Sequence, residues 1–376
     1  MLTRRWLLSG LAVIAAAGVP VLSAGYGADP DAWLVASAAE KLWTTGRYAV
    51  SRFPGYPLHE IVSAPLIGLG GCAASNAGTL VAALLCAALW YRIARTLARS
   101  PLTLFFSLIC APLVLTNAAT TMDYLWSLAF LLAAFACALE NREIAAGIFT
   151  GIAAGFRPSN LTLALPLFLL ISLRNDRASG FRFLFCAAAA ACTSFLPVLV
   201  TYGGPVHWFI LTREEMGDIH PAFDARVIEF GYRLIYAAGP LAFIALGAAA
   251  LRGRKRLAES VRDKDPVMVS SMVAVTVMIA QFFALPLDRA YLLPALPFAL
   301  ILADRLSSPR ASLALFVCIA SLNFVNPDII RHERSGNRVA PNIREGRLAE
   351  SWTERTAMAE LRQKTLEKTG TGAGRP

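Results

Sequence analysis

Long apolar runs separated by short polar segments dominate the chain. A helix needs about 20 apolar residues to cross the hydrocarbon layer of a membrane, and several of the runs have that length. With the first run, 1–24, the pattern predicts about eleven spans. The other predicted spans are 77–98, 102–118, 123–139, 144–156, 159–173, 183–202, 230–251, 267–287, 290–303 and 311–324. We interpret the first run as an uncleaved span, because it is long for a signal peptide.

The segment 25–60 is a polar island in this apolar chain. Asp29 suits a helix N-cap, Pro30 suits the first helical position and Gly46 suits a helix end. Between them Val35 and Ala39 fall on one apolar face, which predicts a helix lying at the membrane interface. A second segment, 57–69, is apolar but too short to cross, so it is predicted to lie at the interface as well.

The composition agrees with an all-α polytopic membrane protein. Hydrophobic residues make up 56% and charged residues 16% of the 376 residues, and the mean hydropathy is +0.55. One soluble core could not bury so much apolar surface. The net charge of +10 arises from basic clusters between spans, which is typical of membrane orientation and argues against a nucleic-acid partner.

The distribution of basic residues also predicts whether the region 144–173 forms one long helix or a hairpin of two short ones. If it forms a hairpin at Arg157-Pro158, every strong basic loop is cytoplasmic, as the positive-inside tendency favours. With this hairpin, successive loops alternate between the two sides of the membrane. The alternation predicts that segment 25–60, Asp123, Arg157 and Asp288-Arg289 all lie on the outer side. Two helices of about 14 residues are shorter than the hydrocarbon layer, so Arg157 is predicted to be recessed below the outer surface.

Three motifs resemble those of the GT-C superfamily of polyprenyl-phosphate-sugar-dependent transferases, especially bacterial aminoarabinose transferases and protein O-mannosyltransferases. An acid, Asp31, begins the first outer helix, and the first motif, Gly-x-aromatic at Gly46-Arg47-Tyr48, ends it. The second motif is a Pro-rich turn at 53–58 that leads into the second helix. The third, at 289–297, has the form Arg-x-Tyr-Leu-Leu-Pro-x-x-Pro. Ala32 and Gly55 depart from the pattern, because many relatives carry a second acid and the aminoarabinose transferases a lysine at these positions.

The resemblance implies inverting transfer of a sugar from a polyprenyl-phosphate donor to a glycan, lipid or protein acceptor. Asp31 is the candidate base, and Asp29 and Asp123 are the other catalytic candidates. The alternative reading of each is a helix cap or a carboxylate favoured at a helix N-terminus. Arginine forks suit phosphate oxygens, so Arg157 and Arg289 are candidates for a phosphate clamp, with snorkelling to lipid headgroups as the alternative. The remaining substrate-binding candidates are Arg52, His59, Glu60 and Tyr291, and for His59-Glu60 a simple polar helix start is the alternative.

These expectations define a transmembrane domain, 1–325, with a catalytic outer loop, 25–76, and an extracytoplasmic polar tail, 326–376, that is partly disordered. The expected location is the inner membrane, among its lipids, with the site facing the periplasm. No cofactor is required by the sequence, and a divalent metal, Mg or Mn, stays open. A polysaccharide ligase or polymerase, which would rely on the later outer loop 206–229, and a transporter or flippase remain alternative functions.

Overall fold

The computed structural model describes residues 3–217, 222–331 and 339–368, and nearly all of them form helices. In chain order the elements are α1 (Arg4–Gly18), η1 (Val19–Val21), α2 (Pro30–Thr45), α3 (Pro57–Leu97), α4 (Pro101–Ile109), α5 (Pro112–Asn117), α6 (Tyr124–Leu139), α7 (Glu143–Phe156), η2 (Pro158–Leu163), α8 (Ala164–Arg174), α9 (Arg177–Thr201), α10 (Pro205–Gly217), α11 (Phe223–Ala238), α12 (Pro240–Arg252), α13 (Arg254–Arg262), α14 (Pro266–Ala284), η3 (Arg289–Ala295), α15 (Leu296–Leu306), α16 (Pro309–Ser321), β1 (Val325–Arg331), β2 (Val339–Glu345) and α17 (Arg347–Lys368).

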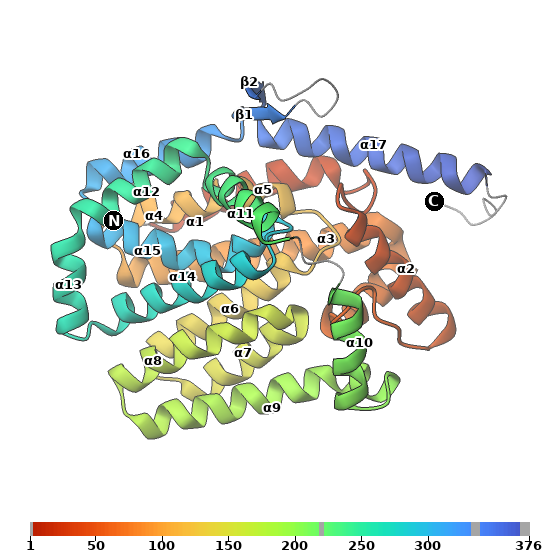
Figure 1. The fold of residues 1–376 in the computed structure, drawn as a ribbon, viewed down its shortest axis with the longest axis horizontal. Coiled ribbons are helices and arrows are strands. Elements are labelled where there is room, and N and C mark those ends of the chain that lie inside the picture. Colours follow the sequence, from red (N-terminus) through yellow and green to blue (C-terminus); the bar gives the residue numbers. More distant parts are fainter. Residues whose placement is uncertain (1–2, 218–221, 332–338, 369–376) are drawn as a thin grey trace.

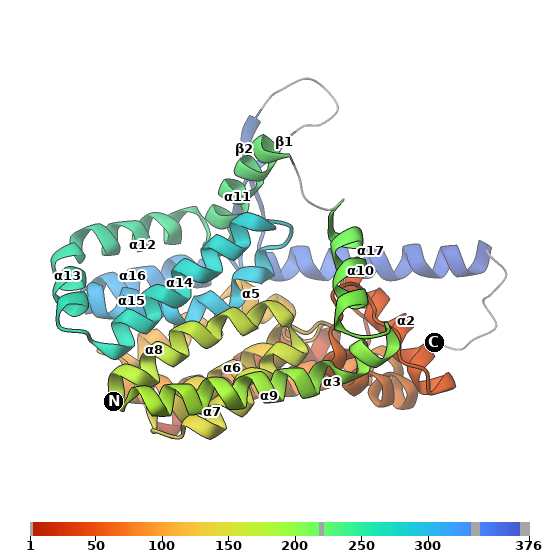
Figure 2. The ribbon, with the colours of Figure 1, turned by 60° about the horizontal axis from the view of Figure 1, so that its bottom comes forward.

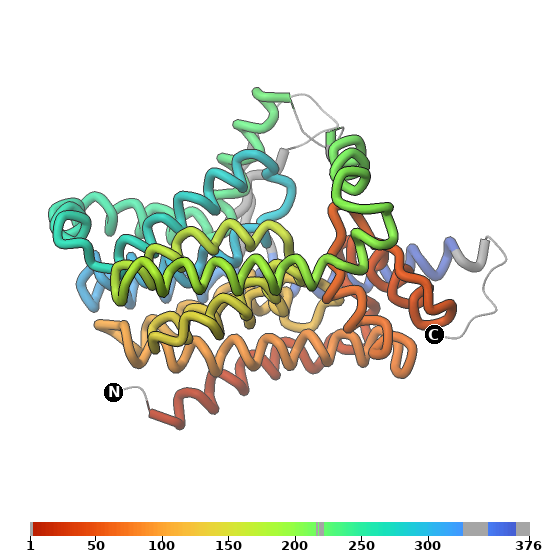
Figure 3. The backbone as a smooth tube through the Cα atoms, turned by 90° about the horizontal axis from the view of Figure 1, so that it is seen from below, coloured from red at the N-terminus to blue at the C-terminus, as the bar shows by residue number. Residues whose placement is uncertain are grey.

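The long helices run side by side and give the bundle two distinct ends (Figure 1). The basic helix α13 lies at one end, and α2 and α10 lie at the other, as a second view confirms (Figure 2). Seen from below, the chain shuttles between these ends (Figure 3). The polar segments that the sequence assigns to the outer side therefore gather at one end of the bundle.

Four described helices are long and apolar enough to cross a membrane, or five if the bent pair α11 and α12 forms one span. The prediction of a polytopic helical membrane protein is thus supported, but the number of about eleven spans stays a prediction. Several predicted spans are divided into shorter helices, because a proline or an extended residue interrupts them. The span predicted at 102–118 is divided in this way into α4 and α5, with Pro112 at the start of α5.

The local signals of the polar island are confirmed. Asp29 is the N-cap of α2, Pro30 is its first residue, and Gly46 ends it in the left-handed conformation with φ of 67°. Helix α3 contains non-helical backbone angles at Gly70 and Gly71. This kink separates the predicted interfacial helix 57–69 from the membrane span that follows it.

Helix α6 lies in the middle of the buried core, where it packs on α3 and α7. Helix α7 in turn packs tightly on α9 through glycines one turn apart. A Cβ atom at Gly147 would lie 2.5 Å from the Phe183 carbonyl oxygen, and one at Gly151 would lie 2.6 Å from that of Ala187. Small residues allow such close approach between membrane helices. This contact fixes the position of α7, whose C-terminal end carries Arg157.

The chain breaks at Arg157, as predicted. Arg157 has extended backbone angles, φ −147° and ψ 103°, between α7 and η2. Both α7 and α8 pack against α9, so the two short helices form a hairpin and not one long helix.

The polar tail contains more regular structure than the sequence indicated. Strands β1 and β2 form an antiparallel ribbon, with Val325 opposite Glu345, which the sequence did not predict within the tail of this otherwise all-α protein. The tertiary pairing of two short segments overrides their weak local propensity. Helix α17 follows the ribbon, whereas 332–338 and 369–376 lie outside the described residues.

Candidate active site

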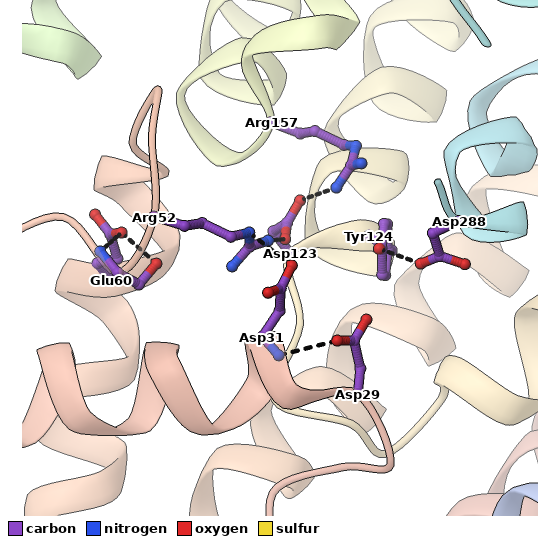
Figure 4. A network of polar contacts seen from close by, with 9 residues as sticks. Asp29, Asp31, Arg52, Glu60, Asp123, Tyr124, Arg157 and Asp288 are labelled. Atoms are coloured by element: carbon purple, nitrogen blue, oxygen red, sulfur yellow. Dashed lines mark hydrogen bonds and ion pairs between the residues drawn. The ribbon is translucent and has the colours of Figure 1, made fainter. Parts of the chain in front are cut away.

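The two acids at the start of α2 have different surroundings. The Asp29 side chain accepts a hydrogen bond from the Asp31 backbone N–H at 2.9 Å, which makes it a helix cap. Burial raises the pKa of Asp29 to about 6. The Asp31 side chain points away from this cap and is 34% exposed. Of the two carboxylates, Asp31 is therefore the one already turned toward the other charged groups (Figure 4).

Four charged side chains form a continuous chain of ion pairs (Figure 4). Arg52 Nε lies 3.1 Å from Asp31 Oδ2, and Arg52 Nη2 lies 2.8 Å from Asp123 Oδ1. The other oxygen of Asp123 lies 2.6 Å from Arg157 Nη1. Asp123 thus connects two guanidinium groups that come from different parts of the chain.

The centre of this chain is removed from solvent. The Asp123 side chain is fully buried and that of Arg157 is 5% exposed. The guanidinium groups of Arg157 and Arg52 both contact this buried carboxylate. A buried carboxylate stays ionised only with such partners, so the cluster is a permanent charged site.

Aromatic rings hold the two arginines in place. The Arg52 guanidinium carbon lies 3.9 Å from the centre of the Tyr56 ring. The Arg157 guanidinium carbon lies 4.4 Å from the Tyr124 ring centre and 4.6 Å from that of Tyr291. Arginine stacks well on aromatic faces, which limits its rotation while leaving its N–H groups available at the ring edges.

The loop that carries Arg52 is tied to the start of α3. The buried Glu60 carboxylate accepts hydrogen bonds at 2.6 Å from both the backbone N–H and the hydroxyl of Ser51, and it also accepts one from the Tyr48 hydroxyl. These bonds fix the residue next to Arg52. Glu60 thus holds the loop beside Arg52, and its predicted contact with substrate stays a prediction.

The loop that carries Asp123 is held by Asn76 of α3. The Asn76 amide donates hydrogen bonds to the carbonyl oxygens of Leu22 and Gly25 at 2.8 and 2.9 Å. Its own oxygen accepts one from the Thr121 hydroxyl at 3.1 Å. One buried amide therefore joins the end of the first span, the beginning of the polar island and the segment before Asp123.

Two cavities flank the charged cluster. The first, here the Arg157 cavity, has a volume of about 330 Å³ and is lined by Arg157, Tyr291 and apolar side chains such as Phe282 and Leu285. The second, the Asp29 cavity, has a volume of about 350 Å³ and is lined by Asp29, Tyr124 and residues from α5, η3 and α17. Tyr124 separates the two, because its ring packs on Arg157 and its hydroxyl bonds to Asp288.

The predicted site residues fall into two groups. Asp31, Arg52, Asp123 and Arg157 form the ion-pair chain, and Tyr291 packs against it. Arg289 lines the Asp29 cavity instead, together with Asp288. The arginine that Asp123 connects to Arg157 is therefore Arg52 and not Arg289. His59 is 1% exposed, and its Nδ1 has no hydrogen-bond partner among the described residues.

Tyr56, Tyr124 and Asp288 belong to this site but were not among the predicted residues. Asp288 stands beside the singled-out Arg289, which is the signal that could have identified it. Tyr124 follows Asp123 directly at the start of α6. Across the described part of the chain, no three His, Cys, Asp or Glu side chains gather in a way that would hold a metal ion, and metal dependence stays open.

The arrangement of the helices is similar to that of one solved membrane-protein structure. The chain matches the crystal structure of ArnT from Cupriavidus metallidurans in the apo state, with a TM-score of 0.55 and 18% sequence identity. The match covers 81% of this chain and 60% of that protein, so the matched part spans about three fifths of the length of its structural neighbour. No protein-family model and no curated protein sequence matches the chain. The similarity thus establishes the fold, which agrees with the resemblance seen in the sequence motifs.

Proposed function

We propose that this protein is a membrane glycosyltransferase that moves a sugar from a polyprenyl-phosphate donor to an acceptor at the periplasmic face of the inner membrane. The observation that carries the proposal is the chain of ion pairs from Asp31 through Arg52 and Asp123 to Arg157. It combines one accessible carboxylate with two arginines at the same end of a helical membrane fold. Proton removal and stabilisation of a phosphate leaving group require these two kinds of group.

The phosphate is expected to bind between Arg52 and Arg157. The Nη1 group of Arg52 is buried and has no hydrogen-bond partner within the described part of the chain, and an unsatisfied buried donor is costly. A phosphate oxygen would satisfy it. The Arg157 cavity adds an apolar wall containing Phe282 and Leu285 beside that arginine, which suits a phosphate attached to a hydrocarbon chain.

Asp31 acts as the general base in this proposal. It takes the proton from the acceptor hydroxyl as the acceptor oxygen attacks the anomeric carbon of the sugar. The bond from this carbon to the phosphate oxygen breaks, and polyprenyl phosphate leaves with the additional negative charge. A single displacement of this kind inverts the anomeric configuration.

The ion pairs suggest how donor binding prepares the base. When no sugar donor is bound, Arg52 shares its N–H groups between Asp31 and Asp123. A phosphate that attracts Arg52 would compete with Asp31 for the guanidinium group, and Asp123 would keep Arg52 in the site. Asp31 would then be released to accept a proton only when a donor is bound.

The decisive experiment compares two Asp→Asn variants in a strain that lacks the gene. Mass spectrometry of its glycolipids and glycans identifies the sugar that the wild-type protein restores. Asp31→Asn should remain folded in the membrane but restore at least about 10²-fold less product, as expected for loss of a general base. Asp265→Asn is the matched control, because Asp265 caps α14 at the other end of the bundle and Asn caps as well as Asp.

Two results would overturn the proposal. Full restoration by Asp31→Asn would remove its main catalytic residue. A strain whose glycolipids and glycans are unchanged by the deletion would argue against sugar transfer itself and favour the transporter or flippase alternative.

A further inference from the structure

Helix α17 is attached to the active-site end of the bundle by polar contacts. Arg355 is 3% exposed although Trp352 and Thr356 on the same helix are exposed. Its guanidinium group donates to the Gly25 carbonyl oxygen, with Nη2 at 3.1 Å, and also to that of Ala119. Both carbonyls lie within four residues of a site acid, so the tail helix is anchored directly beside the site.

A second arginine anchors the beginning of α17. Arg347 is 9% exposed, and its Nη2 donates to the Tyr236 carbonyl oxygen at 2.9 Å. Its Nε group is also buried, yet it has no hydrogen-bond partner among the described residues. Arg347 lines the Asp29 cavity, and an unsatisfied donor in a cavity wall indicates a ligand that can accept a hydrogen bond.

The same face of α17 supplies acceptors to this cavity. Glu350 and Glu354 lie one turn apart and both line it, opposite Asp29 and Asp288. Carboxylates accept hydrogen bonds, whereas guanidinium groups only donate them. A hydroxyl group does both, so a ring with several hydroxyls matches a wall that alternates arginine and carboxylate side chains.

The composition of the two cavities assigns different substrates to them. The Arg157 cavity combines a guanidinium with an apolar wall, whereas neither Arg52 nor Arg157 lines the Asp29 cavity. With a volume of about 350 Å³, the Asp29 cavity has room for a sugar ring. The lipid phosphate and the hydroxyl-rich group would thus approach the site from opposite sides of Tyr124.

We propose that α17 forms one wall of a carbohydrate subsite, in which Arg347, Glu350 and Glu354 bind hydroxyl groups of the acceptor. The inference rests on the proposed glycosyltransferase function and names the acceptor as a hydroxyl-rich glycan or glycolipid headgroup. It gives the polar tail a role in acceptor recognition, which a solvated surface helix would not have.

Cysteine protection tests the two cavities separately. Ser351→Cys reports on the Asp29 cavity and Ser159→Cys on the Arg157 cavity, each in a background without the seven native cysteines. The protein is placed in nanodiscs of phosphatidylglycerol, which contain no sugar. The probes are undecaprenyl phosphate and alkyl glycosides whose heads are a hexose, a pentose or an amino sugar.

At least one neutral glycoside should slow maleimide labelling of Ser351→Cys about three-fold or more, and undecaprenyl phosphate should not. Adding Glu350→Gln and Glu354→Gln should abolish this protection, because an amide is a weaker acceptor for a hydroxyl group than a carboxylate. Glu360→Gln, on the same helix but not in the cavity wall, should leave the protection unchanged.

The outcomes separate the subsite from the proposed function. The carbohydrate subsite would be overturned if no glycoside protected Ser351→Cys or if only the cationic amino sugar did. Protection of Ser351→Cys by undecaprenyl phosphate would overturn it as well. Failure of undecaprenyl phosphate to protect Ser159→Cys would instead contradict the donor site, whatever the glycosides do at Ser351→Cys.

Discussion

Replacing Asp123 by asparagine tests whether the buried ion pairs have the energetic role that their geometry implies. Asn has nearly the same size, so the change removes a charge without leaving a cavity. Arg52 would keep Asp31 as a partner at 3.1 Å. Arg157 would lose its only ionic partner among the described residues while remaining 5% exposed.

The expected loss follows from this asymmetry. Breaking a buried pair by removing one partner typically costs about 3–5 kcal/mol, because an uncompensated charge remains buried. We expect Asp123→Asn to lower the free energy of unfolding by about that amount, which is mainly the cost at Arg157. In the double variant Asp123→Asn with Arg157→Met no such charge remains, so the loss should be smaller than the sum of the single losses by about 1–3 kcal/mol.

Unfolding of the purified protein in detergent, followed by tryptophan fluorescence, measures these differences. Asp176→Asn is the control, since Asp176 is an exposed N-cap whose role Asn can take. It should change stability little. A loss below about 1 kcal/mol for Asp123→Asn, or strictly additive effects in the double variant, would refute the view that Asp123 neutralises Arg157.

Three further results are expected. Because burial raises the pKa of Asp29 to about 6 from an ordinary value of 3.8, the folded protein retains a proton there that the unfolded chain has released, so stability should fall as the pH rises through this window. Asp29→Asn should remove the part of the pH-dependent fall in melting temperature that Asp29 causes. Identical profiles of melting temperature against pH for the variant and the wild-type protein would contradict this prediction. Gly68→Ala should destabilise the packing of α2 on α3 by about 1–3 kcal/mol in thermal unfolding, because the new Cβ would lie 2.4 Å from the Trp43 ring; an unchanged melting temperature would show that the ring moves aside freely. With the native cysteines removed, Arg47→Cys should be labelled from outside and Ala258→Cys only from inside, and outside labelling at 258 would contradict the orientation.

The sequence alone determined the features that depend on neighbouring residues. Asp29, Pro30 and Gly46 specify the start and end of α2 through backbone hydrogen bonds and allowed backbone angles within a few positions. Arg157-Pro158 likewise specifies a break between two helices. Apolar runs specify that the protein belongs in a membrane, because that conclusion depends only on composition and length.

The sequence did not determine how many helices cross the whole membrane, for a physical reason. An apolar run shows that a segment avoids water, but it does not show where prolines and glycines divide it into shorter helices. Residues 102–118 illustrate this, since the break between α4 and α5 lies inside one continuous apolar stretch that was predicted as a single span. Helix ends within such stretches are set by packing against neighbouring helices.

Only the tertiary structure decided which charged residues meet. Arg52 reaches Asp123 across 71 positions, and Arg157 reaches the same carboxylate across 34. Arg355 contacts Gly25 across 330. Such pairings depend on how whole helices pack, as in the close contact of α7 with α9, and no local pattern encodes them. For this reason Arg289 looked equivalent to Arg157 in the sequence, although the fold places it in the other cavity.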